Sequence, residues 1–148
     1  MIHFAFNQSS SSDVKSHLER VSPLFRPELT SYVNLEKYSD KIYKKANRIE
    51  IWDGEMLIGL IAYYLNTEES FAFITNVSLE KEYGGSGLAT QMMWQMIEKV
   101  EGIVNDIKLE VRADNVGAIR FYTKLGFEIV GGDDPIKMEL KRVMEFSK

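Results

Sequence analysis

The sequence predicts one α/β domain over residues 1–148, and three observations support this fold class. The chain has 148 residues, a length typical of a single domain, and 45% of them are apolar, which is enough for an ordinary core. Asp53-Gly54 separates two apolar stretches and is a strong hairpin signal, because both residues tolerate a positive φ. After Gly84 the apolar residues recur at helical spacing. The expected order is helices, a β-meander, and then β-α-β-α-β-β.

The N-terminal part is expected to contain a short strand and two helices. Met1–Phe6 has the composition of a strand, and a polar loop follows it. Ser12 or Asp13 could cap a first helix over Asp13–Arg20. A second helix is expected over Glu28–Ala46, where apolar residues recur near helical spacing.

The middle of the chain is expected to form three antiparallel strands. The expected bounds are Arg48–Trp52, Met56–Leu65 and Phe71–Leu79. Asp53-Gly54 joins the first two strands, and a polar turn joins the second to the third. A meander is the simplest arrangement of three such strands.

Helices and strands are expected to alternate in the C-terminal half. An amphipathic helix begins at Leu88, because apolar residues recur there at every fourth position. Asp114 or Asn115 could cap a second helix, and Gly126 is suited to end that helix in the left-handed conformation. The remaining strands are expected at Ile107–Val111, Phe127–Val130 and Ile136–Leu140.

The composition excludes several kinds of chemistry. The chain has no cysteine, which excludes disulfides, Cys-ligated zinc and a cysteine nucleophile. Any acyl transfer must therefore be direct or pass through an oxygen nucleophile. The two histidines, His3 and His17, have no companions at ligand spacing, so we interpret them as ordinary surface or core residues and expect no metal.

Charge and hydropathy bound the partners and the location. The formal net charge is −4 and the chain has no long basic run, which does not fit a nucleic-acid-binding protein. We interpret Lys41, Lys44, Lys45 and Arg48 as a solvated helix face. Met56–Leu65 is too short for a membrane span, and the N-terminus lacks the pattern of a signal peptide. A cytoplasmic protein without a membrane partner is expected.

A glycine-rich segment over Gly84–Ala89 lies between an expected strand and an expected amphipathic helix. Small residues let the backbone approach a ligand closely, and the first turn of a helix offers unpaired N–H groups at the positive end of its dipole. The segment is therefore a candidate anion site, with a flexible turn as the alternative. It is not a P-loop, because Leu88-Ala89 follow Gly87, and a dinucleotide fingerprint would need a small residue at Thr90.

Two motifs in this order resemble the GNAT superfamily of N-acetyltransferases. The pyrophosphate loop of that family has the pattern Arg/Gln-x-x-Gly-x-Gly/Ala, and this chain matches it at Gly87 and Ala89 but has Gly84 in place of Arg or Gln. A second family segment, Asn-x-x-Ala-x-x-Phe-Tyr-x-x-x-Gly-Phe, is matched downstream with the same spacing by Asn115, Ala118, Phe121-Tyr122 and Gly126-Phe127. The resemblance extends from about Ile49 to Leu140.

The resemblance implies the GNAT fold, with acetyl-CoA as cosubstrate. This fold is a mixed, mostly antiparallel sheet of six or seven strands with helices on both faces, and acetyl-CoA enters at a splay between the fourth and fifth strands. The residues implied to bind acetyl-CoA are Val77, Ser78, Leu79, Gly84, Gly85, Ser86, Gly87, Leu88, Ala89, Asn115, Ala118 and Tyr122. The strand Val77–Leu79 would present N–H groups to the thioester carbonyl and stabilise the oxyanion.

The resemblance also implies two catalytic residues. Tyr122 would donate a proton to the departing thiolate, with packing in the core as the alternative. Leu109-Glu110-Val111-Arg112 resembles the ribosomal-protein N-terminal acetyltransferase subgroup, in which the matching Glu is the base. Glu110 is therefore the candidate that takes the proton of the acceptor amine, with a place on the polar face of a strand as the alternative. Glu80 and Glu82 are weaker candidates and are expected at the surface.

The acceptor stays open between two classes of amine. One class is a small molecule, such as an aminosugar, a polyamine or an amino acid, and the other is a protein N-terminus or lysine. The length of the N-terminal helices favours a small molecule, because they could enclose a pocket. A noncatalytic acyl-CoA-binding sensor or regulatory module is the alternative function, since Gly84 removes a side-chain contact to the cosubstrate. Formation of a homodimer is also left open.

Overall fold

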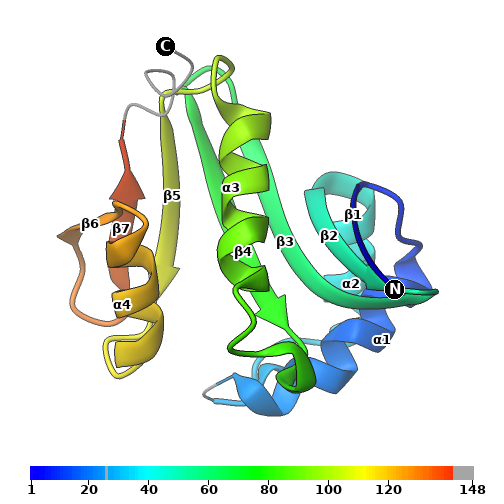
Figure 1. The fold of residues 1–148 in the computed structure, drawn as a ribbon. Coiled ribbons are helices and arrows are strands. Elements are labelled where there is room, and N and C mark those ends of the chain that lie inside the picture. The colour runs from blue at the N-terminus through cyan, green and yellow to red at the C-terminus, as the bar shows by residue number, and fades with distance from the viewer. Residues whose placement is uncertain (26, 142–148) are drawn as a thin grey trace. The chain divides into compact units, whose positions relative to one another are not determined.

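The structure of the chain is a computed structural model that describes residues 1–25 and 27–141. The chain divides into two compact units, one made of Met1–Tyr63 and Asn76–Met96, and the other of Tyr64–Thr75 and the chain from Ile97 onward. Seven strands and four α-helices lie in the described residues (Figure 1). The strands are β1 (Ile2–Phe6), β2 (Asn47–Asp53), β3 (Met56–Asn66), β4 (Phe71–Leu79), β5 (Asp106–Val111), β6 (Glu128–Gly131) and β7 (Ile136–Leu140). The helices are α1 (Ser11–Val21), α2 (Leu35–Lys45), α3 (Leu88–Val100) and α4 (Val116–Lys124).

The strands are hydrogen-bonded in the order β1-β2-β3-β4-β5-β7-β6. β1 with β2, β2 with β3, β5 with β7 and β6 with β7 pair antiparallel. β4 pairs parallel with β5, where Phe71–Phe73 lie opposite Asp106–Lys108. A parallel pair needs a crossover connection, and the segment that contains α3 supplies it. The predicted mixed, mostly antiparallel sheet is therefore confirmed, and each predicted strand is found with bounds that differ by at most one residue.

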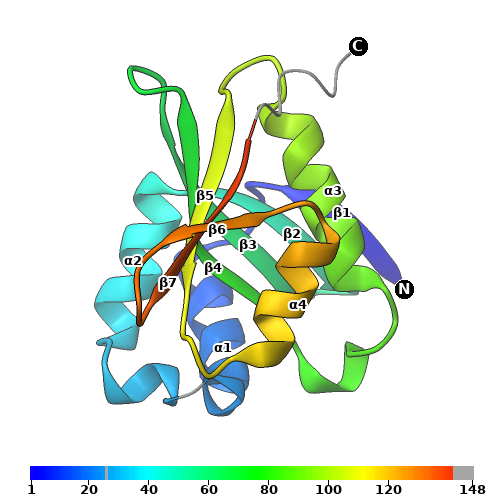
Figure 2. The same ribbon diagram turned by 90° about the vertical axis from the view of Figure 1, so that its left-hand side faces the viewer.

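In the first unit, α1 and α2 lie on one face of the strands and α3 lies on the other (Figure 2). Side chains alternate between the two faces along β4. On one face, Ser78 of β4 contacts His17 of α1. On the other face, Leu79 of β4 and Met92 of α3 both lie against Gly59 of β3. A Cβ at Gly59 would come within 3.2 Å of each of these two side chains, so the glycine permits the close packing of α3 on the sheet.

The starts of α1 and α2 differ from the predictions. Ser10, rather than Ser12 or Asp13, caps α1: its Oγ accepts from Asp13 N at 3.1 Å, and the Asp13 carboxylate accepts from Ser10 N at 2.9 Å. Of the neighbouring serines, only Ser10 has an acidic residue three positions later, which completes a capping box.

The helix predicted over Glu28–Ala46 is wrong in its N-terminal third. That part contains a 3₁₀ turn at Leu29–Ser31, and α2 begins only at Leu35. Asn34 caps α2, because its Oδ1 accepts from Lys37 N at 3.0 Å. A side chain that bonds the backbone in this way favours a helix start over a helix interior.

In the second unit, α4 has the ends that the sequence predicts. Asn115 Oδ1 accepts from Ala118 N at 3.1 Å and caps the helix. Gly126 has a φ of 105° and follows the last residue of the helix, as expected for a left-handed C-terminal glycine. Within the described ranges, the helices are too short or too polar to cross a membrane.

Candidate functional site

The loop that joins β4 to α3 has a backbone that requires glycine at two positions. Gly85 and Gly87 have φ values of 74° and 82°, which side chains rarely tolerate. Nothing lies within 4 Å of the position that a Cβ would occupy at either residue. The space above these two glycines is therefore open to a ligand.

Gly84 differs from the two other glycines of the loop. Its φ of −64° and ψ of 152° are accessible to any residue. A Cβ at this position would lie 3.3 Å from the carbonyl oxygen of Lys81, a tight contact that a small shift relieves. The backbone thus does not require glycine here, and it is compatible with the Arg or Gln of the motif.

The N-terminus of α3 follows the loop directly. The first helical bond runs from Gln91 N to Gly87 O at 3.1 Å. The N–H groups of Leu88, Ala89 and Thr90 precede this bond and have no carbonyl one turn earlier in the helix. Together with the positive end of the helix dipole, they suit an anion such as a diphosphate. The predicted loop residues Gly84–Ala89 thus form one continuous run in the first unit.

Two hydrogen bonds fix the loop to its surroundings. The Tyr83 hydroxyl donates to Asp53 Oδ2 at 2.5 Å, which ties the loop to the β2–β3 hairpin. The Ser86 hydroxyl donates to the carbonyl of Tyr83. The bond from Tyr83 lowers the pKa of Asp53, and the same bond, with a smaller contribution from burial, raises the pKa of Tyr83 to about 12. Tyr83 therefore keeps its proton at neutral pH, and the loop stays anchored.

The buried face of β4 changes from apolar to polar along the strand. Ala72 and Ile74 occupy it first, and Asn76, Ser78 and then Glu80 follow at the same alternation. Val77 and Leu79 are half-buried, at the alternate positions of the strand. The family resemblance implies that Ser78 binds acetyl-CoA together with Val77 and Leu79, and the side chain of Ser78 also belongs to a buried polar group.

A chain of hydrogen bonds connects these polar residues of β4 to α1 and α2. His17 Nε2 lies 2.8 Å from Ser78 Oγ, and the Ser78 hydroxyl lies 2.8 Å from Asn76 Oδ1. Asn76 Nδ2 donates to the Tyr38 hydroxyl at 3.5 Å. At the other end, His17 Nδ1 lies 3.4 Å from Glu80 Oε2. We call this set the buried relay.

The buried relay was not predicted from the sequence, because His17 was interpreted as an ordinary surface or core residue. His17 is 0% exposed, and both of its ring nitrogens have polar partners. The signal that could have revealed the relay is the spacing of Asn76, Ser78 and Glu80, which are polar at alternate positions of a strand whose other residues on that face are apolar.

Glu80 is buried, and the expectation that it lies at the surface is wrong. Arg20 Nε donates to Glu80 Oε2 at 2.8 Å, and Arg20 Nη2 donates to the carbonyl of Leu57 at 2.9 Å. Burial by itself raises the pKa of Glu80, but the hydrogen bonds and charges of His17 and Arg20 together outweigh it and lower the pKa below the ordinary 4.5. The partners of Glu80 come from α1, more than sixty positions away for His17, so local sequence did not reveal them.

Tyr122, Asn115 and Ala118 lie in α4 or at its start, in the second unit. The Tyr122 ring lies edge-on to Phe121, with centroids 5.3 Å apart, and 5.6 Å from the ring of Phe127. Burial raises the pKa of Tyr122 to about 12, so its hydroxyl is protonated at neutral pH. Asn115 caps the helix, because its side-chain oxygen accepts a hydrogen bond from Ala118 N.

Glu110 lies on β5, also in the second unit. It is exposed, and it lies opposite Lys137 in the register between β5 and β7. This position on the polar face of a strand is the alternative that the sequence left open beside a catalytic role.

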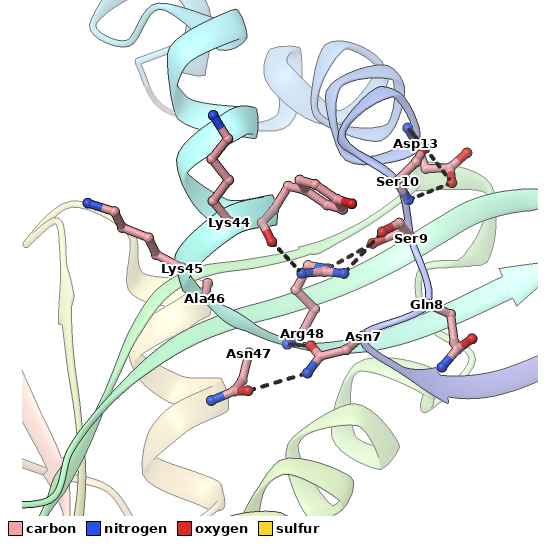
Figure 3. Close-up of a pocket in the computed structure, with 11 residues that line it drawn as sticks. Asn7, Gln8, Ser9, Ser10, Asp13, Lys44, Lys45, Ala46, Asn47 and Arg48 are labelled. Carbon is pink, nitrogen blue, oxygen red and sulfur yellow. Dashed lines mark hydrogen bonds between the residues drawn. The ribbon is translucent and has the colours of Figure 1, made fainter.

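A hollow of about 700 Å³ lies between the start of α1 and the end of α2 (Figure 3). Arg48 lines it, and the prediction that Arg48 lies on a solvated helix face is wrong, because α2 ends before it and Arg48 is buried on β2. Its guanidinium donates to Ser9 Oγ at 2.9 Å, to Ser9 O and Tyr43 O at 3.0 Å each, and pairs with buried Glu50 at 3.3 Å. Arg48 thus joins the segment before α1 to α2 and β2, and its guanidinium is occupied by protein partners.

Comparison with known proteins agrees with this geometry. The model of the acetyltransferase (GNAT) family matches residues 16–127. No curated protein matches the sequence. Among solved structures, the ribosomal-protein-S18-alanine N-acetyltransferase from Escherichia coli is 17% identical, with a TM-score of 0.75 over 96% of this chain and 94% of that one.

Two further solved structures have the same fold. The paia N-acetyltransferase from Thermoplasma acidophilum, in complex with coenzyme A, is 18% identical, with a TM-score of 0.70 over 94% of this chain and 99% of that one. A chimera of spermidine N-acetyltransferase from Vibrio cholerae and hSSAT is also 18% identical, with a TM-score of 0.78 over 98% and 99%. The family match covers most of the chain, including the glycine loop and α4, and this chain therefore belongs to the GNAT family and is an acetyl-CoA-dependent N-acetyltransferase.

Proposed function

We propose that this enzyme transfers the acetyl group of acetyl-CoA directly to a primary amine. The observation that carries the proposal is the loop Gly84–Ala89, whose open glycines and following helix start suit the pyrophosphate of coenzyme A. The solved structure of the paia N-acetyltransferase in complex with coenzyme A supports the same ligand for this fold. Direct transfer is favoured because the chain has no cysteine to form a thioester intermediate.

In the proposed reaction, backbone N–H groups of Val77–Leu79 polarise the thioester carbonyl. The acceptor nitrogen attacks the carbonyl carbon, the C–S bond breaks, and coenzyme A leaves as a thiolate. Tyr122 donates a proton, or a hydrogen bond, to this thiolate. Its high pKa supports the role of donor, because the hydroxyl still carries its proton at neutral and mildly alkaline pH.

The amine must lose a proton before it attacks, because a primary ammonium has no free electron pair. By resemblance, Glu110 is the candidate base. Its carboxylate is exposed on β5 and could accept a proton through water. This role stays a prediction.

The acceptor belongs to one of two classes, a small-molecule amine or a protein N-terminus. Two of the similar solved structures are named for acceptors of these two classes. The enzyme from E. coli is named for an alanine of a ribosomal protein, and the chimera from V. cholerae and hSSAT is named for spermidine. We favour a small-molecule amine, because α1, α2 and their 3₁₀ connections lie on the face of the strands from which Ser78 projects. Such a wall suits a compact acceptor more than an extended peptide.

The proposal is tested by calorimetric titration with acetyl-CoA, followed by a panel of small amines and peptide N-termini monitored by release of coenzyme A. Gly87→Glu is the control for binding, because it places a carboxylate over the anion site. Tyr122→Phe is expected to keep the Kd for acetyl-CoA and to lower kcat by about 10- to 100-fold. Unchanged turnover would remove Tyr122 from the mechanism, and tight binding without transfer to any amine would favour the noncatalytic sensor.

A further inference from the structure

The buried relay is not explained by stability alone. Ala72 and Ile74 show that the same face of β4 accommodates apolar side chains. Glu80 is buried, and an ion pair made by a buried carboxylate is often no more stabilising than well-packed apolar residues. Sites where a sequence places polar residues in a core without such a gain are frequently functional.

The hydrogen-bond directions in the relay allow two states. A serine hydroxyl has one proton, so Ser78 donates either to Asn76 Oδ1 or to His17 Nε2. In the neutral state with the ring proton on Nδ1, His17 donates to Glu80 and accepts from Ser78. In the state with both ring protons, His17 donates to Glu80 and to Ser78, and Ser78 donates to Asn76. Every donor of the relay has an acceptor in both states, whereas the acceptor Asn76 Oδ1 loses the Ser78 donor when Ser78 donates to His17. A proton can therefore arrive and leave without leaving a buried donor unpaired.

We propose that Ser78 and His17 relay the proton of the acceptor ammonium during acetyl transfer, and that Glu80 positions His17 for this step. The inference rests on the proposed function, because it requires the acetyl group to lie at Val77–Leu79, next to the Ser78 hydroxyl. A hydroxyl, an imidazole and a carboxylate follow one another in the same order in serine hydrolases, where the carboxylate holds the histidine in one tautomer. Here the hydroxyl passes a proton and forms no bond to carbon.

The protons of the reaction balance. The ammonium gives one proton to Ser78 Oγ while the Ser78 proton moves to His17 Nε2, which leaves a neutral amine and a charged imidazole. The amine attacks the thioester, a C–N bond forms and the C–S bond breaks. The second proton leaves the nitrogen with the collapse of the intermediate and ends on the thiol of coenzyme A. The His17 proton returns through Ser78 to water after the products leave.

Glu80 itself is poorly suited to take the proton. Its pKa lies below the ordinary value, so it stays ionised at neutral pH and is a weak base. Its carboxylate, 3.4 Å from His17 Nδ1, instead accepts a hydrogen bond from this nitrogen and holds the orientation of the ring. The charged and titratable groups in the surroundings of His17 are Glu80 from the end of β4, Arg20 from α1 and, through Asn76, Tyr38 from α2.

The first test compares serine variants. Ser78→Ala removes the hydroxyl, and we expect kcat to fall by about 100-fold while the Kd for acetyl-CoA changes little. Ser78→Thr keeps the hydroxyl and should recover most of the rate. Ser39→Ala is the matched control, because Ser39 is also buried but its hydroxyl has no partner within the described residues.

The second test observes the relay without an acceptor. The chain has two histidines, so the His3→Gln variant leaves His17 as the single imidazole in a ¹⁵N NMR spectrum. We expect the neutral ring to carry its proton on Nδ1. A neutral ring protonated on Nε2 would overturn the relay, because Nε2 could not then accept from Ser78.

The outcomes separate this inference from the proposed function. Full activity of Ser78→Ala, or an acetylated Ser78 found by mass spectrometry during turnover, would overturn the relay and leave the acetyltransferase intact. A wild-type chain that binds acetyl-CoA and acetylates no amine would instead overturn the proposed function and, with it, the role of the relay.

Discussion

A single methyl group at Gly87 tests whether the glycine loop holds the cosubstrate. Gly87 has a φ of 82°, and a Cβ there meets nothing within 4 Å in the free protein. The change Gly87→Ala therefore has two separable costs. One is backbone strain in the free protein, and the other is a collision with whatever ligand occupies the open space.

Gly102 provides a matched control for the strain. Its φ is 80°, and a Cβ there also meets nothing within 4 Å. A left-handed conformation costs an L-residue about 1–2 kcal/mol, so both variants should lose that much free energy of unfolding. For a chain of this length, each kcal/mol corresponds to a fall in Tm of about 2–4 °C. We expect similar losses of Tm for Gly87→Ala and Gly102→Ala in the absence of ligand.

Only Gly87→Ala should weaken the binding of acetyl-CoA. A methyl group forced into an occupied, well-packed site costs about 1–3 kcal/mol. This cost corresponds to an increase in Kd of about 5- to 150-fold by calorimetry. Gly102→Ala should bind acetyl-CoA with the Kd of the wild type. Equal Kd values for Gly87→Ala and the wild type would refute the placement of the pyrophosphate at this loop.

Two further predictions concern charges of the first unit. Gly84→Arg should lower the Kd for acetyl-CoA by about 5- to 30-fold. The backbone at this position accepts a side chain, and a charge-assisted hydrogen bond contributes about 1–2 kcal/mol. Gly84→Ala is the control. Weaker binding by the arginine variant would show that this position does not face the pyrophosphate. Glu80→Gln should lower the free energy of unfolding by about 1–3 kcal/mol at pH 7. The pKa of Glu80 is lower in the folded protein than its ordinary value of 4.5. The contribution of the Glu80 carboxylate to stability is therefore fully present above pH 4.5 and is lost as the pH falls through the folded pKa. The free energies of unfolding of the wild type and Glu80→Gln, measured in urea, should converge in acid. A constant difference down to the lowest pH would contradict this assignment of the charge.

The sequence predicted those elements whose signals are local. β4 and β7 have the predicted bounds, and α4 has the predicted cap and terminal glycine, because alternation, Asn115 and Gly126 act within one turn or one strand. The glycine loop was found for the same reason. The positive φ values of Gly85 and Gly87 are a local requirement that only one residue type meets well.

The errors have two different causes, one a local helix cap and the other a set of tertiary partners. Helical spacing continued through Glu28–Ala46, but the Asn34 side chain stops it and starts α2 later. Arg48 looked like part of a basic helix face, yet Ser9 and Glu50 bury it on β2. In both cases the propensity of the segment was real and was outweighed by a side-chain contact, but only the contact of Arg48 with Ser9 is distant in the sequence.

The same distinction explains why one part of the site was evident and another was not. The loop and the polar half of β4 are neighbours in the sequence, since the segment Asn76–Ala89 contains both. The loop is visible as a sequence motif because the backbone conformation at its own positions requires glycine. The relay depends on His17, 63 positions before Glu80, so neither residue carries the signal alone. A polar residue at alternate positions of an otherwise buried strand is then the more general indication, because burial makes a distant partner necessary whatever its identity.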